Sequence, residues 1–378
     1  MSAVSEDASP PEPDRLDGAP HPRDTVRLVG QQAAEEMFLQ TFNTGRLHHG
    51  WLITGPRGIG KATLAWRIAR FLLTHPEAGT ADGLFGAPAP PETLDVDPEH
   101  PVARRVRARS EPRLFHICRS PSLTTGRLRD QIVAEDVRGL AAFFSLRATE
   151  GGRRVVLIDA ADDLNVHAAN ALLKMLEEPP AGAVLLLVSH QPGRLLPTIR
   201  SRCRALPLAP LSASDLATAL TQAGYDPGRE SAALGALAQG SVGTAIGLLG
   251  QDGTKLYAEI VALAGTLPAL DRARAVKLSS TLAVRGAEAQ LDLMFDLIEL
   301  FLARLARAGA GGAVPAEAVS GEADVLARLA PSADSARAWA ACAQEIAARA
   351  RHGRAVNLDP ATLVLDTVFQ LQRTAQAV

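Results

Sequence analysis

A glycine-rich segment near residue 55 constrains the fold of this chain more than any other feature of its sequence. The segment reads Gly55-Pro-Arg-Gly-Ile-Gly-Lys61; it follows the short apolar run Trp51–Thr54 and opens a helical pattern. In a turn between a strand and a helix, glycines let backbone N–H groups curl around a phosphate, and the helix N-terminus adds its dipole. The segment therefore predicts a phosphate-binding loop formed by Gly55, Gly58, Gly60 and Lys61.

The residue after Lys61 departs from a complete loop of this kind. A loop that also holds Mg²⁺ has Ser or Thr at this position, and here the residue is Ala62. Thr63 comes one residue later and points about 100° away around the helix, which makes it a poor substitute, although we count it with the degenerate nucleotide site. Two alternatives stay open: a loop that binds ATP or ADP weakly, and an inherited loop that binds neither.

Apolar runs of strand length alternate with helical patterns in this part of the chain. Because several are apolar throughout, they are typical of parallel strands buried on both faces. The alternation predicts an α/β domain with a parallel sheet over residues 25–209, in which residues 76–112 form an inserted loop. The further expected strands are Leu114–Ile117, Val155–Ile158, Val184–Val188 and Ala205–Leu208.

The rest of the chain shows no strand pattern. Residues 1–24 are rich in proline and acidic residues, and such a segment buries too little apolar surface to fold, so we expect a flexible tail. Residues 210–251 contain short helical patterns and are expected to form a small helical domain. Residues 252–378 contain longer ones and are expected to form a helical C-terminal domain.

A second acidic element follows the expected strand Val155–Ile158. Phosphate-loop hydrolases place an Asp at such a strand end for Mg²⁺, and many place a Glu beside it to activate water. This chain has Asp159 followed by Ala160. General-base assistance contributes about 10²–10⁴ in rate, so efficient hydrolysis is not expected. Asp162 or Asp163 could substitute, but a helix N-cap is the favoured role for them.

Composition excludes several other classes of protein. No apolar run approaches the ~20 residues of a membrane-spanning helix, and no secretory signal is recognisable, so we expect a cytoplasmic protein. The three cysteines are far apart and form no CxxC pair, which predicts neither a zinc site nor a disulfide framework. The net charge is −2, yet arginines gather in two stretches that could meet phosphates or simply be solvated: Arg104, Arg105, Arg107, Arg109 and Arg113, and Arg194, Arg200, Arg202 and Arg204.

Several motifs occur in a characteristic order. They are Val29-Gly-Gln31, the glycine-rich loop, Leu157-Ile-Asp-Ala-Ala-Asp162, Asn170-Ala-Leu-Leu-Lys-Met-Leu-Glu-Glu-Pro-Pro180 and Ser201-Arg-Cys203. The combination resembles the AAA+ subunits of the bacterial DNA polymerase III clamp loader, and among them the delta-prime family most closely. The resemblance covers Val26 to Leu249 in motifs and the remainder in architecture only. It implies an AAA+ domain, a helical lid over residues 210–251 and an oligomerising collar over 252–378.

The resemblance also implies roles for residues and partners. Arg202 would act as an arginine finger on the γ-phosphate of a neighbouring subunit, and Glu177, Glu178, Ser201 and Cys203 would lie near the subunit interface. Gamma/tau and delta subunits would be the direct partners, with the sliding clamp contacted indirectly and primed DNA as the substrate. No cofactor is expected to be required. The zinc module of many relatives is expected to be absent, because residues 76–118 hold only Cys118.

The sequence therefore predicts a non-hydrolysing subunit of the replicative clamp loader, without enzymatic activity of its own. A third departure supports this: Thr244 stands where relatives often carry an arginine that senses nucleotide. The alternatives are a self-sufficient AAA+ ATPase that acts on DNA, against which Ala160 argues, and a separate DNA-binding protein with a relict phosphate loop.

Overall fold

The computed structural model describes residues 12–16, 18–75, 89–122, 124–145, 152–312 and 316–378, and these form two compact units. The first unit comprises Met1–Ala223 together with Gly240–Gly243, and the second comprises Gly224–Gln239 and Thr244–Val378. The predicted lid over residues 210–251 is thus shared between the two units, with α7 (Ala213–Gln222) in the first and α8 (Ser231–Ala238) in the second.

The first unit is built on a five-stranded parallel sheet, which confirms the predicted α/β fold. Its strand order is β2-β3-β4-β1-β5. Every residue of β4 is buried, as expected for a central strand that is covered on both faces. Because all strands are parallel, their carboxyl ends lie at one edge of the sheet. The strands are β1 (Gly50–Thr54), β2 (Leu114–Ile117), β3 (Arg154–Ile158), β4 (Ala183–Ser189) and β5 (Arg204–Pro207).

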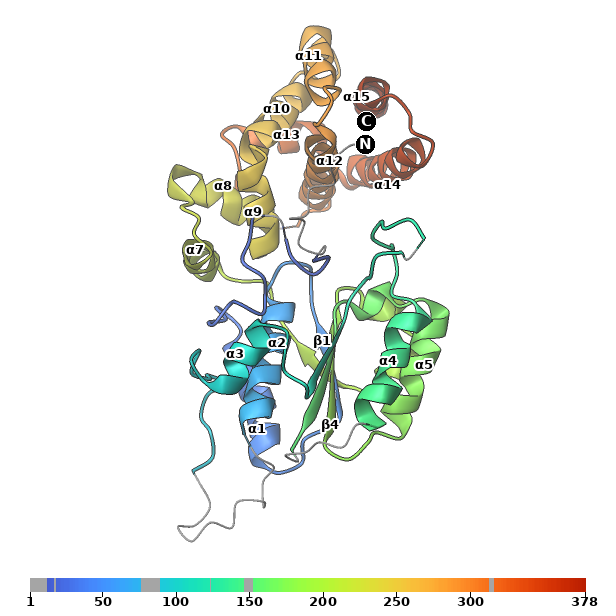
Figure 1. The fold of residues 1–378 in the computed structure, drawn as a ribbon. Helices are drawn as coiled ribbons and strands as arrows, with labels where there is room; N and C mark the ends of the chain where they lie inside the picture. The colour runs from blue at the N-terminus through green and yellow to red at the C-terminus, as the bar shows by residue number, and fades with distance from the viewer. Residues whose placement is uncertain (1–11, 17, 76–88, 123, 146–151, 313–315) are drawn as a thin grey trace, which may run out of the picture. The chain divides into compact units, whose positions relative to one another are not determined.

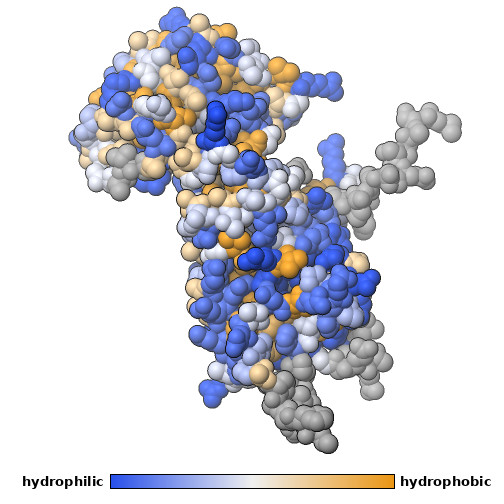
Figure 2. All heavy atoms as spheres, turned by 90° about the vertical axis from the view of Figure 1, so that its left-hand side faces the viewer, coloured by the Kyte–Doolittle hydropathy of each residue, from blue (hydrophilic) through white to orange (hydrophobic). Residues whose placement is uncertain are grey.

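Helices cover both faces of the sheet (Figure 1). On one face lie α1 (Gln32–Asn43), α2 (Lys61–Thr74) and α3 (Pro101–Arg107), and on the other lie α4 (Ala134–Ser145) and α5 (Val166–Glu177). Figure 2, which is viewed from the side of α2 and α3, shows a largely hydrophilic surface on this unit with small apolar areas. The helix α2 is buried along most of its length, because it packs against the sheet on one side and α3 on another.

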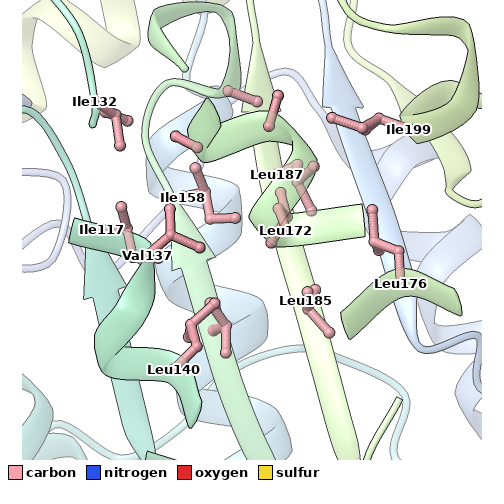
Figure 3. Close-up of a cluster of buried hydrophobic side chains, with 14 of the residues drawn as sticks. Ile117, Ile132, Val137, Leu140, Ile158, Leu172, Leu176, Leu185, Leu187 and Ile199 are labelled. Atoms are coloured by element: carbon pink, nitrogen blue, oxygen red, sulfur yellow. The ribbon is translucent and has the colours of Figure 1, made fainter. Parts of the chain in front are cut away.

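The apolar core beneath α4 and α5 explains why the motif Asn170–Pro180 is rich in leucine. Leu172 and Leu176 are buried and Leu173 is partly buried against the same cluster, so these leucines pack in the core. Figure 3 shows Leu172 beside Leu187 of β4, and Leu176 Cδ2 would lie 3.0 Å from a Cβ at Gly50 of β1. The charged end of this motif, by contrast, remains at the surface.

The inserted segment differs from its prediction as an irregular loop. Residues 76–88 lie outside the described residues, but Pro101–Arg107 forms the helix α3. Pro101 is at the first helical position, and the His100 ring accepts a hydrogen bond from the Val102 backbone N–H at 3.2 Å. The helix buries Val102, Ala103 and Val106 and is therefore amphipathic. The prediction missed it because the segment was judged by its high arginine content.

The predicted flexible tail is wrong for the described residues between positions 12 and 24. His21 is only 2% exposed, and its Nε2 lies 3.0 Å from Asp14 Oδ2. The same carboxylate oxygen lies 3.4 Å from Nε2 of His116 in β2. Polar contacts with residues far along the chain hold this segment on the domain. The prediction failed because the composition of a segment does not show such contacts. Residues 1–11 and 17 lie outside the described residues.

The second unit is helical wherever the structure describes it, as predicted for the C-terminal region. Helix α12 packs against α14, and α11 packs against α15. Within the described ranges, every helix is too short or too polar to cross a lipid bilayer. Apart from α8, its helices are α9 (Val242–Gly250, which begins in the first unit), α10 (Gly253–Gly265), α11 (Arg272–Leu282), α12 (Glu288–Gly309), α13 (Glu322–Leu329), α14 (Ala333–Ala355) and α15 (Pro360–Ala377).

Candidate nucleotide site and arginine finger

The glycine-rich loop connects β1 to α2 at the carboxyl edge of the sheet, where a phosphate site was predicted. Gly58 has φ +74°, and a Cβ there would lie 2.3 Å from Ser241 Oγ. Gly60 has φ +99°, and a Cβ there would lie 2.6 Å from Leu28 Cδ1. The Gly243 N–H also donates to the Gly58 carbonyl oxygen at 3.1 Å. Both glycines are therefore required by conformation and by close packing, and the segment Gly240–Gly243 lies directly on the loop.

Lys61 is turned toward the loop itself. Lys61 is only 3% exposed, and its ammonium group donates a hydrogen bond to the Pro56 carbonyl oxygen. Burial lowers the pKa of Lys61 to about 8, although the carboxylates of Asp159 and Asp162 act in the opposite direction. An ammonium so placed uses one of its donors within the loop, so a phosphate would have to compete for it. Thr63 lies in the first turn of α2 and is half-buried.

Asp159 follows β3 at the same edge, and it is not a simple exposed carboxylate. Burial raises its pKa to about 7; Asp14 adds to the shift, and Lys61 opposes it. Its backbone N–H donates to the Ile117 carbonyl oxygen at 2.9 Å. Ala160 beside it is 4% exposed, so the position where hydrolases carry a base lies in the protein interior. The structure thus brings Lys61 and Asp159 together, with no adjacent general base.

The alternative carboxylates are already engaged. Asp162 accepts hydrogen bonds from Ser189 Oγ at 2.8 Å and from the backbone N–H groups of His190 and Gln191, which fixes the end of β4. Asp163 Oδ2 lies 3.4 Å from Nε of Arg119.

The predicted N-cap role of Asp162 and Asp163 is wrong. The cap of α5 is Asn165, whose side chain accepts from the Ala168 N–H at 2.8 Å. The reason is a short 3₁₀ turn, Ala161–Asp163, which delays the start of α5.

Asp14 is a site residue that sequence reasoning missed. It lies near enough to Asp159 to raise the pKa of that carboxyl group. Burial acts against ionisation of Asp14, but the close contact with His21 and the charges of His116 and His21 outweigh it and lower its pKa to about 2. No motif marks it, because its partners are contributed by distant parts of the chain.

Arg202 lies between α6 (Pro197–Arg200) and β5, and it is partly exposed. Its Nη2 lies 2.9 Å from Glu177 Oε1, and its Nη1 donates to the Thr198 carbonyl oxygen at 3.1 Å. Ser201 and Glu178 are exposed beside it. Cys203 is half-buried, and burial raises the pKa of its thiol to about 12, so it is an inert neighbour. The structure therefore gathers the predicted interface residues on one surface.

The sheet register separates Arg202 from the phosphate loop of its own chain. In the parallel pair β1–β5, Trp51 is opposite Arg204 and Thr54 is opposite Pro207. Arg202 precedes β5 at the amino edge, whereas the loop begins after Thr54 at the carboxyl edge. Three strand steps alone span roughly 10 Å, and Arg202 lies two residues further back.

Comparison with known proteins finds relatives of this part of the chain. Residues 30–212 match the protein family described as DNA polymerase III, delta subunit. Subunit delta' of DNA polymerase III from Pseudomonas aeruginosa is 39% identical over 225 residues, which cover 56% of this chain and 59% of that protein. Residues 30–212 are therefore similar to delta-prime-like subunits of the DNA polymerase III clamp loader. The resemblance noted in the sequence is thereby confirmed.

Other members of the same complex are also similar to this chain. The Escherichia coli delta' subunit is 31% identical over 182 residues, 46% of each chain, and the Buchnera aphidicola gamma subunit is 28% identical over 195 residues, 52% of this chain and 47% of that protein. A gamma subunit-related protein of Thermotoga maritima has a TM-score of 0.33 at 14% identity, covering 89% of this chain and 99% of that one. The matches span about half the length of the curated relatives.

No group of three or more His, Cys, Asp or Glu side chains in the described part of the chain is placed to hold a metal ion. The absence of zinc, like the nucleotide affinity of the loop, stays a prediction.

Proposed function

We propose that this chain is a non-hydrolysing subunit of the replicative clamp loader and supplies Arg202 to the ATP site of a neighbouring subunit. The observation that carries the proposal is the position of Arg202 at the amino edge of the sheet, away from the phosphate loop of its own chain. An arginine side chain there is too far from its own loop to contact a bound phosphate, but it is accessible to another chain. An arginine supplied in trans stabilises charge in phosphoryl transfer and contributes about 10³–10⁵ in rate in GTPases.

The state of the chain's own site supports the non-hydrolysing part of the proposal. Lys61 is bonded to Pro56, Asp159 is held in an environment that favours its neutral form, and Ala160 offers no base. Asp162 already accepts three hydrogen bonds, so it is poorly suited to activate water. Each feature weakens Mg²⁺ or water activation, and together they leave no complete catalytic set.

The relatives suggest the partners. Because similar proteins are delta', gamma and tau subunits of DNA polymerase III, gamma/tau and delta chains are the proposed neighbours. The helical second unit would form the collar that joins them. In this role the chain would help to place the sliding clamp on primed DNA during replication in the cytoplasm, and it would require no cofactor.

ATP hydrolysis by a reconstituted clamp loader tests the proposal. An Arg202→Ala chain is expected to reduce turnover by at least tenfold, while Arg138→Ala, an exposed arginine of α4 that pairs with Glu135, is expected to have no effect. A Glu177→Gln chain separates the two roles of Arg202, because it removes the local ion pair and keeps the guanidinium. It is expected to retain turnover.

Two results would overturn the proposal. If Glu177→Gln and Arg202→Ala reduce turnover equally, Arg202 acts only through its local ion pair. If the purified chain alone hydrolyses ATP efficiently and Arg202→Ala leaves the complex unaffected, the chain is a self-sufficient ATPase.

A further inference from the structure

A small hollow on the outer side of α2 is surrounded by guanidinium groups. Its volume is about 20 Å³, and four arginines contribute to its wall from three segments of the first unit. Residues 23–26, which precede α1, meet the helices α2 and α3 here, together with the segment that leads into α3. The lining residues are Arg23, Asp24, Val26, Arg67, Arg70, Leu94, Val96, Pro98, Ala103 and Arg107.

The charge of Arg67 is fully compensated. Its Nε donates to Glu35 Oε1 at 2.8 Å and its Nη2 to Asp95 Oδ1 at 2.9 Å. Its remaining group donates to the Val26 carbonyl oxygen. Three of the five N–H donors of Arg67 are used in these bonds, and two carboxylates oppose its charge, so it contributes mainly to the shape of the wall.

Arg23 is only partly satisfied. Its side chain is 13% exposed, and its Nη2 donates to Glu12 Oε1 at 2.6 Å. Its Nε and Nη1 atoms are buried and have no hydrogen-bond acceptor among the described residues. The nearest carboxylate contact of Nε, with Asp24 Oδ1, is 4.0 Å long. Buried donors without acceptors are costly, and a bound acceptor would relieve that cost.

Arg70 and Arg107 have no carboxylate partner in the described part of the chain. Arg70 donates to the carbonyl oxygens of Arg23 at 2.5 Å and Thr25 at 3.0 Å. Burial lowers the pKa of Arg70 to about 10, and the charges of Arg67 and Arg107 add to the shift. Arg107 is exposed at the end of α3. Two guanidinium groups at the hollow thus have no ion-pair partner among the described residues, although Asp24 in the same wall partly offsets the charge of Arg70.

We propose that this hollow binds a single phosphate group. A phosphate oxygen is an acceptor with negative charge, which matches unsatisfied guanidinium donors, and arginine forms paired hydrogen bonds with it. A volume of about 20 Å³ holds roughly one water-sized group, such as a phosphate oxygen. Asp24 in the wall opposes the anion and limits its affinity. This site is separate from the glycine-rich loop, and the inference does not depend on the proposed function.

The phosphate has two potential sources, free phosphate and a nucleic-acid backbone. Arg104 lies one turn before Arg107 on α3; it is exposed and has no ion pair with a described residue. A strand whose phosphate occupies the hollow could therefore meet a second arginine. The surface on this side is hydrophilic (Figure 2).

The site is tested by titrating the full chain with inorganic phosphate. Calorimetry measures binding, and the rise in melting temperature with phosphate concentration measures stabilisation. Arg107→Ala is expected to weaken phosphate binding about tenfold (about 1.4 kcal/mol), while Arg138→Ala changes it less than twofold. Because Arg107 is exposed, this variant is expected to fold. Lys61→Met, which alters the other candidate phosphate site, is expected to leave the affinity unchanged.

The proposal is overturned if phosphate shows no saturable binding, if Arg107→Ala and Arg138→Ala behave alike, or if the affinity is lost with Lys61→Met instead. The source is identified with a single-stranded oligonucleotide. If Arg107→Ala weakens DNA binding and reduces its log–log salt dependence by about one, the bound group is a backbone phosphate. If DNA binding matches that of Arg138→Ala while phosphate binding is lost, the site takes free phosphate.

Discussion

Replacing Glu322 with alanine is expected to destabilise the helical unit strongly, because this carboxylate joins three helices in its interior. Its Oε1 accepts hydrogen bonds from the Tyr257 hydroxyl of α10 and from Arg304 Nε of α12, both at 2.6 Å. Its Oε2 accepts from Arg304 Nη2 at 3.0 Å and from the Ala318 N–H at 2.8 Å. The side chains of Arg304 and Glu322 are 1% and 0% exposed, so water does not reach the groups that the substitution would leave unpaired.

The size of the effect follows from this burial. Removing one partner of a buried ion pair leaves an uncompensated charge and costs about 3–5 kcal/mol. The Tyr257 hydroxyl would lose its acceptor as well, which adds to the cost. In a unit of this size 1 kcal/mol shifts the melting temperature by about 2–4 °C, so a loss of about 4 kcal/mol predicts a decrease of about 8–16 °C.

Scanning calorimetry of the full chain measures this shift, and an exposed pair provides the control. Asp366 Oδ2 lies 2.6 Å from Arg349 Nη1, with side chains 41% and 52% exposed, so Asp366→Ala is expected to cost about 0–1 kcal/mol. A double variant, Arg304→Met with Glu322→Leu, removes both charges and is expected to be more stable than Glu322→Ala alone. Equal shifts for Glu322→Ala and Asp366→Ala would refute the reasoning, as would a double variant less stable than Glu322→Ala.

Three further substitutions test the first unit. His116→Gln should flatten the pH dependence of the melting temperature between about pH 6.5 and 4. Burial lowers the pKa of His116 to about 4, so in this window the unfolded chain binds a proton that the folded chain does not. The stability of the wild-type chain therefore falls as the pH falls through the window. Asn165→Ala should cost about 1 kcal/mol in denaturant unfolding, since it removes the α5 cap; an unchanged midpoint would contradict this. Gly58→Ala should cost about 1–2 kcal/mol and speed amide exchange in residues 240–243, because its positive φ and its contact with Ser241 leave no room for a methyl group; unaltered exchange would argue against that packing.

The sheet could be predicted from the sequence because each of its strands is marked by a short continuous run of apolar residues. Val155–Ile158 and Leu114–Ile117 are continuous apolar runs of strand length, and the observed strands differ from them by at most one residue. Such runs are buried on both faces of a parallel sheet, so no other arrangement satisfies them as well. The Gly55–Lys61 loop was predictable for the same reason, since its glycines encode a backbone conformation.

The parts that were missed depend on contacts between distant segments. Asp14 reaches its position near Asp159 through contacts with His21 and His116, and the sequence separation of these residues hides the cluster. Acidic and proline-rich composition predicted disorder there, but burial of His21 against Trp66, with ring centroids 6.0 Å apart, supplies an apolar anchor. Composition describes the average tendency of a segment to be ordered or disordered, but it does not show whether another part of the chain offers a surface on which the segment packs.

The phosphate loop and Arg202 lie at opposite edges of the sheet, so substitutions at one edge can leave the other unchanged. This separation would allow a subunit to lose hydrolysis and keep its role in a complex. At the carboxyl edge, Ala160 and the engaged Lys61 weaken the chain's own site. At the amino edge, the polar contacts of Arg202 with described residues are those with Glu177 and Thr198, so we expect changes around the loop to leave its surroundings intact. If the proposed function holds, substitutions at the carboxyl edge affect this chain's nucleotide alone, whereas substitutions near Arg202 affect the ATP of another subunit. On this proposal, loss of hydrolysis at the carboxyl edge places no constraint on an arginine supplied from the amino edge of the same sheet.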